Sequence, residues 1–287
     1  MLRVEHLEEM GDISFYLPKG YICGLIGENG AGKTTLMRIL MGLYNSSGDI
    51  IIDGRNIRNE EDVVKDSLGL IIQDDFFDGK MSLEQIGSFY GELYTAFNMR
   101  LYLEYLERFR LDKTQKYKNL SKGMKIKVQF AFALSHDAKL FLFDEPTAGL
   151  DKNFREEFLE ICAGIVSDGE RSVVISSNIT EDLDRIADYI AYMQDGKMLF
   201  YMPKEELCDR FYVVSGEDYK CNLIAKEAVV YKEKGNYSTS AMVIDRKRFL
   251  IDEALKKRRP DIREFMHYFV KGGKQNAEII AQKYLQI

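Results

Sequence analysis

A glycine-rich run of eight residues near the N-terminus carries the strongest chemical signal in the sequence. Residues 27–34 read Gly-Glu-Asn-Gly-Ala-Gly-Lys-Thr and fit G-x-x-x-x-G-K-[ST], a pattern that binds the phosphates of a nucleoside triphosphate. Glycines let backbone N–H groups close around phosphate oxygens, and the N-terminus of a following helix favours negative charge. A chance glycine turn would match this pattern in roughly one chain in a hundred at ordinary residue frequencies.

The run predicts a phosphate and magnesium site. We expect Lys33 to reach the β- and γ-phosphates and Thr34 to ligate Mg²⁺. The residues expected to bind the nucleotide here are Gly27, Glu28, Asn29, Gly30, Ala31, Gly32, Lys33, Thr34 and Thr35.

Two adjacent carboxylates form a second signal. The apolar run Leu140–Phe143 predicts a buried strand, and Asp144 and Glu145 follow it directly. Ligand sites of α/β proteins lie at the carboxyl ends of the strands. Because strand side chains alternate, Asp144 suits a water-mediated hold on Mg²⁺ and Glu145 suits a general base that orients the attacking water. Taken alone, an acidic turn that merely ends the strand explains this pair equally well.

The elements that must position these residues alternate between strand and helix. Residues 13–26 predict two short strands, the second leading into the glycine loop, and Leu36, Ile39, Leu40 and Leu43 recur at helical spacing after it. Further strands are expected at 68–73 and 172–177, a hairpin at 48–56, and helical segments at 82–135 and 154–166. This alternation predicts an α/β fold, a parallel sheet with helices on both faces.

The pattern of predicted elements changes past about residue 205. Residues 228–231 and 240–244 flank Lys234-Gly235-Asn236 as a predicted hairpin, and Pro260-Asp261 predicts the start of a helix. We therefore expect a small C-terminal α+β extension at residues 206–287.

With these motifs in order, residues 1–205 resemble the ABC ATPase family. Gln73 matches the Q-loop glutamine, which in that family contacts Mg²⁺, and residues 120–124, Leu-Ser-Lys-Gly-Met, resemble the signature motif LSGGQ. Ala148–Asp151 matches the D-loop. The resemblance implies that Ser121 and Gly123 contact the γ-phosphate bound by a partner chain. It also gives Asp144 and Glu145 the roles of metal-associated carboxylate and catalytic base.

The resemblance further implies an architecture and partners. We expect an ABC ATPase domain at 1–205, with an edge antiparallel β subdomain and a helical subdomain at about 76–135. The cofactors would be ATP and Mg²⁺. Because the signature lies away from its own phosphate loop, two ATP-binding subunits must pair head to tail, as a homodimer. A separate transmembrane permease subunit would bind this dimer at the cytoplasmic face of the membrane.

Three departures from the family pattern are visible. Lys122 and Met124 replace a glycine and a glutamine of the signature, and Lys122 is either a cation for the γ-phosphate or a solvated surface residue. Asn178 stands where the family has a switch histidine; it can donate an amide hydrogen bond but cannot become cationic. Asn178 also lies three residues before Glu181, as a helix N-cap would. No residue stands out as an adenine-stacking partner after the shortened N-terminal hairpin.

Composition excludes several classes of function. A formal net charge of −6 argues against a nucleic-acid partner, and the basic run at 256–259 is better explained as a solvated helix face. The four cysteines form no C-x-x-C pair, so neither a disulfide framework nor a zinc site can be deduced. No apolar stretch approaches the roughly 18 residues of a membrane-spanning helix, and the N-terminus lacks a signal-peptide core.

The signature variant and the segment Pro260–Met266 resemble ATP-binding subunits of ABC-2-type bacterial exporters of peptides, antibiotics or multiple drugs. Two alternatives remain: a soluble ABC ATPase acting in translation or DNA repair, and an ATP-binding sensor with little turnover.

Aromatic residues beside Gln73 would receive a helix of the membrane subunit or would simply pack the core; they are Phe76, Phe77, Phe89, Tyr90, Tyr94 and Phe97.

Overall fold

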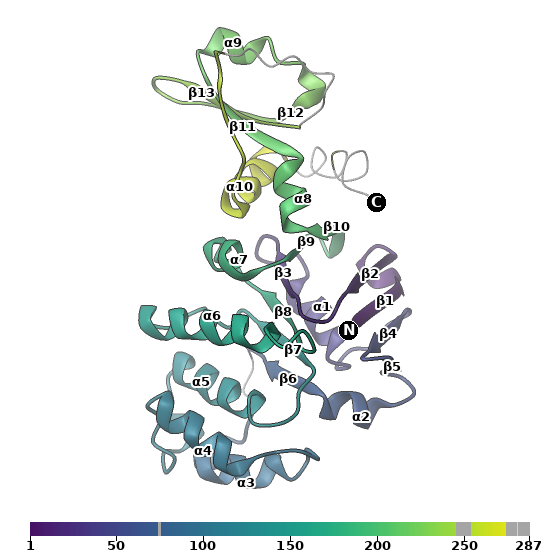
Figure 1. Cartoon of the computed structure of the whole chain (residues 1–287), viewed down its shortest axis with the longest axis vertical. Coiled ribbons are helices and arrows are strands. Elements are labelled where there is room, and N and C mark those ends of the chain that lie inside the picture. The colour runs from purple at the N-terminus through teal and green to yellow at the C-terminus, as the bar shows by residue number, and fades with distance from the viewer. Residues whose placement is uncertain (74–75, 245–253, 274–279, 281–287) are drawn as a thin grey trace.

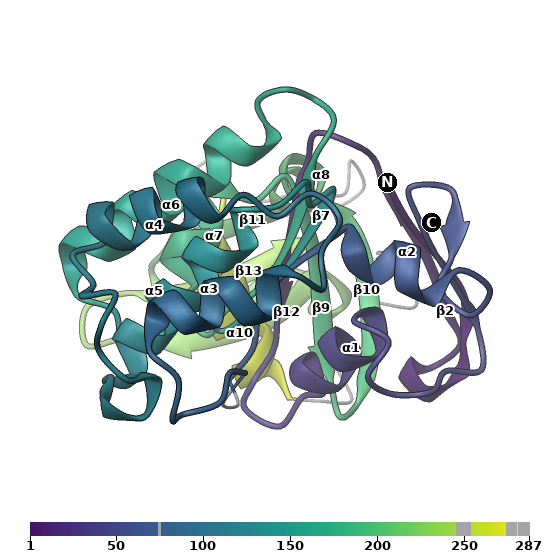
Figure 2. The same ribbon diagram turned by 90° about the horizontal axis from the view of Figure 1, so that it is seen from below.

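The structure is a computed structural model that describes residues 1–73, 76–244, 254–273 and 280. Figure 1 shows the elements spread along one long axis. At one end lie the helices α3 (Leu83–Gly91), α4 (Met99–Arg108) and α5 (Lys122–Ala133). At the other end lie the strands β11 (Phe211–Gly216), β12 (Val229–Lys234) and β13 (Thr239–Ile244). The large sheet from which the glycine loop leads lies between these ends, and Figure 2 views the molecule from below, with α3 and α4 toward the viewer and β12 and β13 behind.

A six-stranded sheet of order β10-β9-β3-β8-β7-β6 forms the centre of the fold. The neighbours from β6 to β9 run parallel, and β10 is antiparallel to β9. Its strands are β3 (Ile22–Ile26), β6 (Leu68–Ile71), β7 (Leu140–Asp144), β8 (Ser172–Ser176), β9 (Tyr189–Gln194) and β10 (Lys197–Pro203). The predicted parallel sheet is confirmed.

Helices cover both faces of this sheet. Along β7, Leu140 and Leu142 join the apolar cluster that contains residues of α1 (Lys33–Leu40). The alternate residues Phe141 and Phe143 join the opposite cluster, which contains residues of α6 (Lys152–Val166) and α7 (Thr180–Ile186). Because strand side chains alternate in direction, a continuous apolar run is what a strand buried on both faces requires.

An antiparallel sheet of order β2-β1-β4-β5 forms the N-terminal edge. It contains β1 (Leu2–Leu7), β2 (Ile13–Leu17), β4 (Asp49–Ile52) and β5 (Arg55–Asn56), with the 3₁₀ turn η1 (Glu8–Met10) and helix α2 (Glu61–Asp66) nearby. The expected hairpin at 48–56 forms, and its turn residues Asp53 and Gly54 both have positive φ. One boundary was wrong: α1 ends at Leu40, and Leu43 is exposed, because Gly42 adopts a left-handed conformation.

The segment 82–135 is helical, as predicted. It contains α3 (Leu83–Gly91), α4 (Met99–Arg108), the 3₁₀ turn η2 (Tyr117–Asn119) and α5 (Lys122–Ala133). The capping box is present, because the Ser82 hydroxyl accepts from the backbone N–H of Gln85 while the Gln85 side chain accepts from that of Ser82. Among the aromatic residues beside Gln73, Phe77 is buried against Tyr90 and Phe132, whereas Phe89 is 57% exposed.

The C-terminal segment folds around a second antiparallel sheet of order β12-β13-β11-β14, with a small apolar cluster of its own. Its elements are α8 (Lys204–Asp209), β11 (Phe211–Gly216), α9 (Asp218–Asn222), η3 (Lys226–Ala228), β12 (Val229–Lys234), β13 (Thr239–Ile244), β14 (Lys256–Arg258) and α10 (Ile262–Gly272). The predicted hairpin and final helix are confirmed. The division at residue 205 stays a prediction.

The basic run at 256–259 is not on a helix face, which corrects the sequence-based interpretation. Its first three residues form β14, paired with β11 at the edge of the C-terminal sheet. The ammonium of Lys257 and the guanidinium of Arg259 each lie 3.9 Å from the centre of the Tyr212 ring. Cation–π contacts with β11 therefore accompany the strand pairing at this edge.

Candidate functional site

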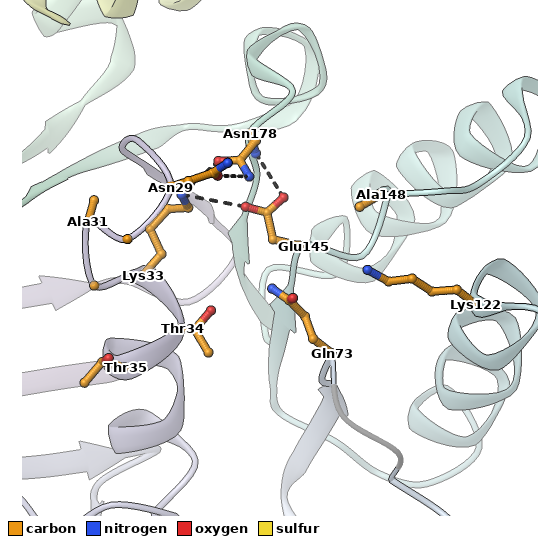
Figure 3. A pocket seen from close by; sticks show the side chains of 12 residues that line it. Asn29, Ala31, Lys33, Thr34, Thr35, Gln73, Lys122, Glu145, Ala148 and Asn178 are labelled. Carbon is orange, nitrogen blue, oxygen red and sulfur yellow. Dashed lines mark hydrogen bonds and ion pairs between the residues drawn. The ribbon is translucent and has the colours of Figure 1, made fainter.

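The glycine loop connects β3 to α1 at the carboxyl edge of the central sheet (Figure 3). Gly32 is the N-cap of α1 with φ +102°, a conformation that side-chain-bearing residues rarely adopt. At Gly27 a Cβ atom would lie 2.4 Å from the carbonyl oxygen of Met193. Glycine is therefore required at both ends of the loop for the chain to turn tightly beside β9.

Lys33 is buried within the loop that precedes it. Its Nζ atom donates to the carbonyl oxygens of Gly27 at 2.8 Å and Glu28 at 3.2 Å. It also donates to Oδ1 of Asn178 at 2.9 Å and lies 3.7 Å from a carboxylate oxygen of Glu145. Burial lowers the pKa of Lys33, while the carboxylates of Glu145 and Asp144 oppose that shift. The ammonium thus occupies the junction between the loop, β7 and β8.

The three predicted magnesium ligands meet at Asp144, which is 3% exposed. Its Oδ2 atom accepts from the Thr34 hydroxyl at 2.9 Å and from the Gln73 amide at 3.3 Å. Its Oδ1 atom accepts from the Ser176 hydroxyl at 2.6 Å. A hydroxyl, an amide and one carboxylate are oxygen donors of the kind Mg²⁺ takes, usually together with substrate phosphates and water. The residues therefore fit this ion.

The donor set also limits how Mg²⁺ could be held. In the described part of the chain, no group of three or more His, Cys, Asp or Glu side chains could hold a metal ion. A cation bound by Thr34 and Asp144 would therefore need phosphate oxygens of the nucleotide to complete its coordination shell.

Glu145 follows the end of β7 in a left-handed conformation, with φ +50°. Its backbone N–H donates to the Ser176 hydroxyl at 2.8 Å, and its carboxylate accepts from the backbone N–H of Asn178 at 3.1 Å. A non-glycine residue held in this region often marks a functional site. The turn directs the carboxylate toward the glycine loop (Figure 3), whereas the carboxylate of Asp144 accepts from Thr34.

Asn178 contacts the glycine loop and does not cap a helix. This corrects the interpretation of Asn178 as a helix N-cap. The N-cap residue of α7 is Ile179, and no side chain caps that helix. The Asn178 amide donates to Oδ1 of Asn29 at 2.9 Å and accepts from Lys33. The side chain therefore joins the end of β8 to the loop across the site.

The signature segment forms the N-terminus of α5. Ser121 is its N-cap, with the hydroxyl accepting from the backbone N–H of Met124 at 3.3 Å. Gly123 lies so close to the predicted D-loop that a Cβ atom would be 2.8 Å from the carbonyl oxygen of Gly149. Glycine at position 123 is thus required by packing within this chain.

These elements enclose a cavity of about 380 Å³. It is lined by Asn29, Gly30, Ala31, Gly32, Lys33, Thr34, Thr35, Gln73, Lys122, Glu145, Ala148 and Asn178. Gly27 and Glu28 face a neighbouring cavity, and Asp144 lies buried behind Thr34. Of the signature, only Lys122 lines the cavity, and Ser121 and Gly123 do not.

Sequence reasoning missed Ser176, although it contacts both carboxylate residues. Its hydroxyl lies between Oδ1 of Asp144 and the backbone N–H of Glu145. The only signal in the sequence is a serine at the end of a predicted strand, since its position opposite Asp144 depends on the register of β7 and β8.

Comparison with known proteins agrees with this geometry. Residues 10–148 match the sequence model of the ABC transporter family. The ABC transporter ATP-binding protein YtrB of Bacillus subtilis is 29% identical over 218 residues, which cover 75% of this chain and 74% of that protein. The lantibiotic transport ATP-binding protein SrtF of Streptococcus pyogenes is 32% identical over 214 residues, covering 69% and 89%.

Solved structures show the same fold. The ATP-binding subunit of an ABC transporter has a TM-score of 0.67 at 24% identity, covering 73% of this chain and 92% of that one. A dimeric ATP-binding cassette bound to ADP and Pi has a TM-score of 0.64 at 18% identity, covering 71% and 98%. The motifs, the fold and the relatives together establish that this chain belongs to the ABC transporter family, as an ATP-binding subunit.

Proposed function

We propose that this chain hydrolyses Mg-ATP and couples each cycle to export of a substrate by a separate membrane subunit. One observation carries the proposal: Lys33 and Thr34 from one segment of the chain meet Asp144 and Glu145 from another, 110 positions away, beside one cavity. A phosphate-binding loop, oxygen donors for Mg²⁺ and a carboxylate beside them are the parts that ATP hydrolysis requires.

Each residue has a proposed role in this reaction. The backbone N–H groups of Gly30–Lys33 would hold the phosphates, with Lys33 Nζ donating to the β- and γ-phosphate oxygens. Mg²⁺, when bound by Thr34, Gln73 and Asp144, would neutralise charge on those oxygens. Glu145 would accept a hydrogen bond from the attacking water and take its proton as the bond to phosphorus forms.

The site needs a second chain in this proposal. Ser121 and Gly123 do not line the cavity of their own chain, although they keep the hydroxyl and the close backbone approach that contact with phosphate needs. We assign them to the nucleotide of a second ATP-binding subunit in a homodimer. The dimeric state of the solved cassette bound to ADP and Pi supports this assignment.

The proposed membrane partner is a permease at the cytoplasmic face. No helix within the described residues is long and apolar enough to cross a membrane. Phe89 and Leu93, 57% and 72% exposed, lie at the end of the aromatic cluster that follows Gln73 and offer apolar contact to a permease helix. We assign export because the signature variant and the segment Pro260–Met266 resemble ABC-2-type exporters, and because a lantibiotic transport ATP-binding protein is among the relatives. In this scheme residues 1–205 are the ATPase domain and 206–287 are an added domain.

One observation favours a second candidate, an ATP-binding sensor with little turnover. Asn178 is neutral, and its side chain is already hydrogen-bonded to Asn29 and Lys33. A site without an ionisable group at this position has one fewer means of stabilising the charge that develops on the γ-phosphate.

Two measurements test the proposal and separate the candidates. The chain, expressed with its neighbouring genes, should co-purify with a polytopic membrane protein. The complex should release phosphate from ATP at a steady rate that chelation of Mg²⁺ abolishes. Tight ATP binding without steady phosphate release, in the complex as well as in the isolated chain, would instead identify the sensor.

A further inference from the structure

Lys122 is the one signature residue that lines the cavity of its own chain. It is the first residue of α5, immediately after the N-cap Ser121, and its side chain is exposed. Figure 3 shows the side chain extending from α5 toward Gln73 and Glu145, on the side of the cavity opposite the glycine loop. Lys122 has no hydrogen bond or ion pair with any other residue in the part of the chain that the structure describes.

The location is unfavourable for a cation unless an anion is nearby. The N-terminus of a helix carries partial positive charge, which disfavours lysine in the first turn. The first turn of α5 has no acidic residue to offset this. The next two lysines are compensated locally, since Lys125 lies over the Tyr117 ring and Lys127 lies over the Phe154 ring and 3.5 Å from Asp151.

The charges around the cavity indicate which anion this would be. Lys33 faces two carboxylates, Asp144 and Glu145, while Asn178 is neutral. Mg-ATP carries a net charge of about −2 near neutral pH, so that the occupied cavity has an excess of negative charge that one further cation would reduce. The terminal phosphate would lie between Lys33 and Glu145, on the side to which Lys122 extends.

We propose that Lys122 binds the terminal phosphate group of ATP within its own chain and supplies the positive charge that Asn178 lacks. The assignment rests on the proposed role of this cavity as the ATP site. It distinguishes Lys122 from Ser121 and Gly123, which we assign to the nucleotide of the partner chain. Because ADP lacks the γ-phosphate, the contribution of Lys122 must be specific to ATP.

The test compares the affinities of ATP and ADP at a protein concentration where light scattering shows a monomer, so that only contacts within one chain count. Lys122→Gln should bind Mg-ATP about 5- to 10-fold more weakly than the wild type, as expected for a partly solvated charge-assisted contact. Its affinity for Mg-ADP should change by less than about twofold. Lys122→Arg, which keeps the charge, should bind ATP nearly as well as the wild type.

Lys118→Gln is the matched control, because Lys118 lies shortly before Lys122 in the sequence, is also exposed and does not line the cavity. It should leave both affinities unchanged. An unchanged ATP affinity in monomeric Lys122→Gln, or an equal loss for ATP and ADP, would overturn the assignment. Lys33→Ala tests separately whether the cavity is the ATP site. If Lys33→Ala also left the ATP affinity unchanged, the cavity would not be the ATP site.

Discussion

The Thr34 hydroxyl donates a hydrogen bond to Oδ2 of Asp144 over 2.9 Å and joins the first turn of α1 to the end of β7. The two residues are 110 positions apart in sequence. A hydroxyl and a carboxylate held this close present two oxygen ligands to a single point at the sheet edge. The contact thus ties the phosphate-binding loop to the segment that carries Glu145.

Lys33→Ala should abolish tight ATP binding. The substitution removes a charge-assisted contact with phosphate worth roughly 1.5–3 kcal/mol, or about 10- to 150-fold in affinity. Equilibrium titration with Mg-ATP measures this loss, and a thermal unfolding curve checks that the variant is folded. An unchanged dissociation constant would contradict the assignment of the loop.

Gly123→Ala should destabilise the chain, because the new methyl group would lie 2.8 Å from the carbonyl oxygen of Gly149 and either α5 or the D-loop must move. A loss of about 1–3 kcal/mol in the free energy of unfolding is expected. Gly164→Ala is the control: Gly164 lies in α6 with nothing within 4 Å of an added Cβ, so this change should be neutral or stabilising by up to about 1 kcal/mol. Urea unfolding measures the free energy of unfolding of both variants. Equal changes in Gly123→Ala and Gly164→Ala would show that α5 and the D-loop are not in close contact.

His136 should make stability depend on pH. Its ring nitrogens lie 2.9 Å and 3.2 Å from the carbonyl oxygens of Leu68 and Phe132, and burial lowers the pKa of the ring. The unfolded chain takes up a proton near pH 6.5, whereas the folded chain resists protonation to lower pH. The free energy of unfolding should therefore fall as pH drops through about 6.5, by at most about 1.4 kcal/mol between pH 7.5 and 5.5.

The control for this pH effect is His136→Gln, which has no titratable group. Its free energy of unfolding should fall less over the same pH interval, by the amount that His136 contributes. The same fall in wild type and variant would assign the effect to other groups.

Asn178→His should raise the rate of ATP hydrolysis. A histidine adds a longer, ionisable donor at the γ-phosphate, and a charged hydrogen bond exceeds a neutral one by roughly 1 kcal/mol, or about 5-fold in rate. Asn178→Ala, which removes the contacts to Asn29 and Lys33, should not raise it. Steady-state phosphate release measures the hydrolysis rate of both variants. A slower Asn178→His enzyme of normal stability would indicate that Asn178 only positions the loop.

Much of the fold could be predicted because local patterns determine it. The apolar run ahead of Asp144 specifies a strand buried on both faces, and the pair Ser82 and Gln85 specifies where α3 begins. The end of α1 could not be predicted from periodicity, since Leu43 continues the helical spacing while Gly42 breaks the backbone conformation. The strand β14 depends on pairing with β11, which its own basic residues do not reveal.

The candidate site shows the same difference between local sequence patterns and contacts of distant segments. The glycine run and the Asp144–Glu145 pair are local patterns whose chemistry can be deduced directly. The contacts of Ser176 with Asp144 and of Asn178 with Asn29 depend on strand register and loop packing between distant segments. That is why sequence reasoning missed Ser176 and left the capping role of Asn178 open.

If Glu145 is the base of an ATP-hydrolysing site, removal of its carboxylate must stop turnover, which steady-state phosphate release by Glu145→Gln measures. Glutamine keeps the shape but cannot accept a proton, so the variant should bind Mg-ATP like the wild type and lose about 10²- to 10⁴-fold in rate. Glu160→Gln, at an exposed position on α6, is the matched control and should keep full activity. Turnover retained in Glu145→Gln would show that Glu145 is not the base.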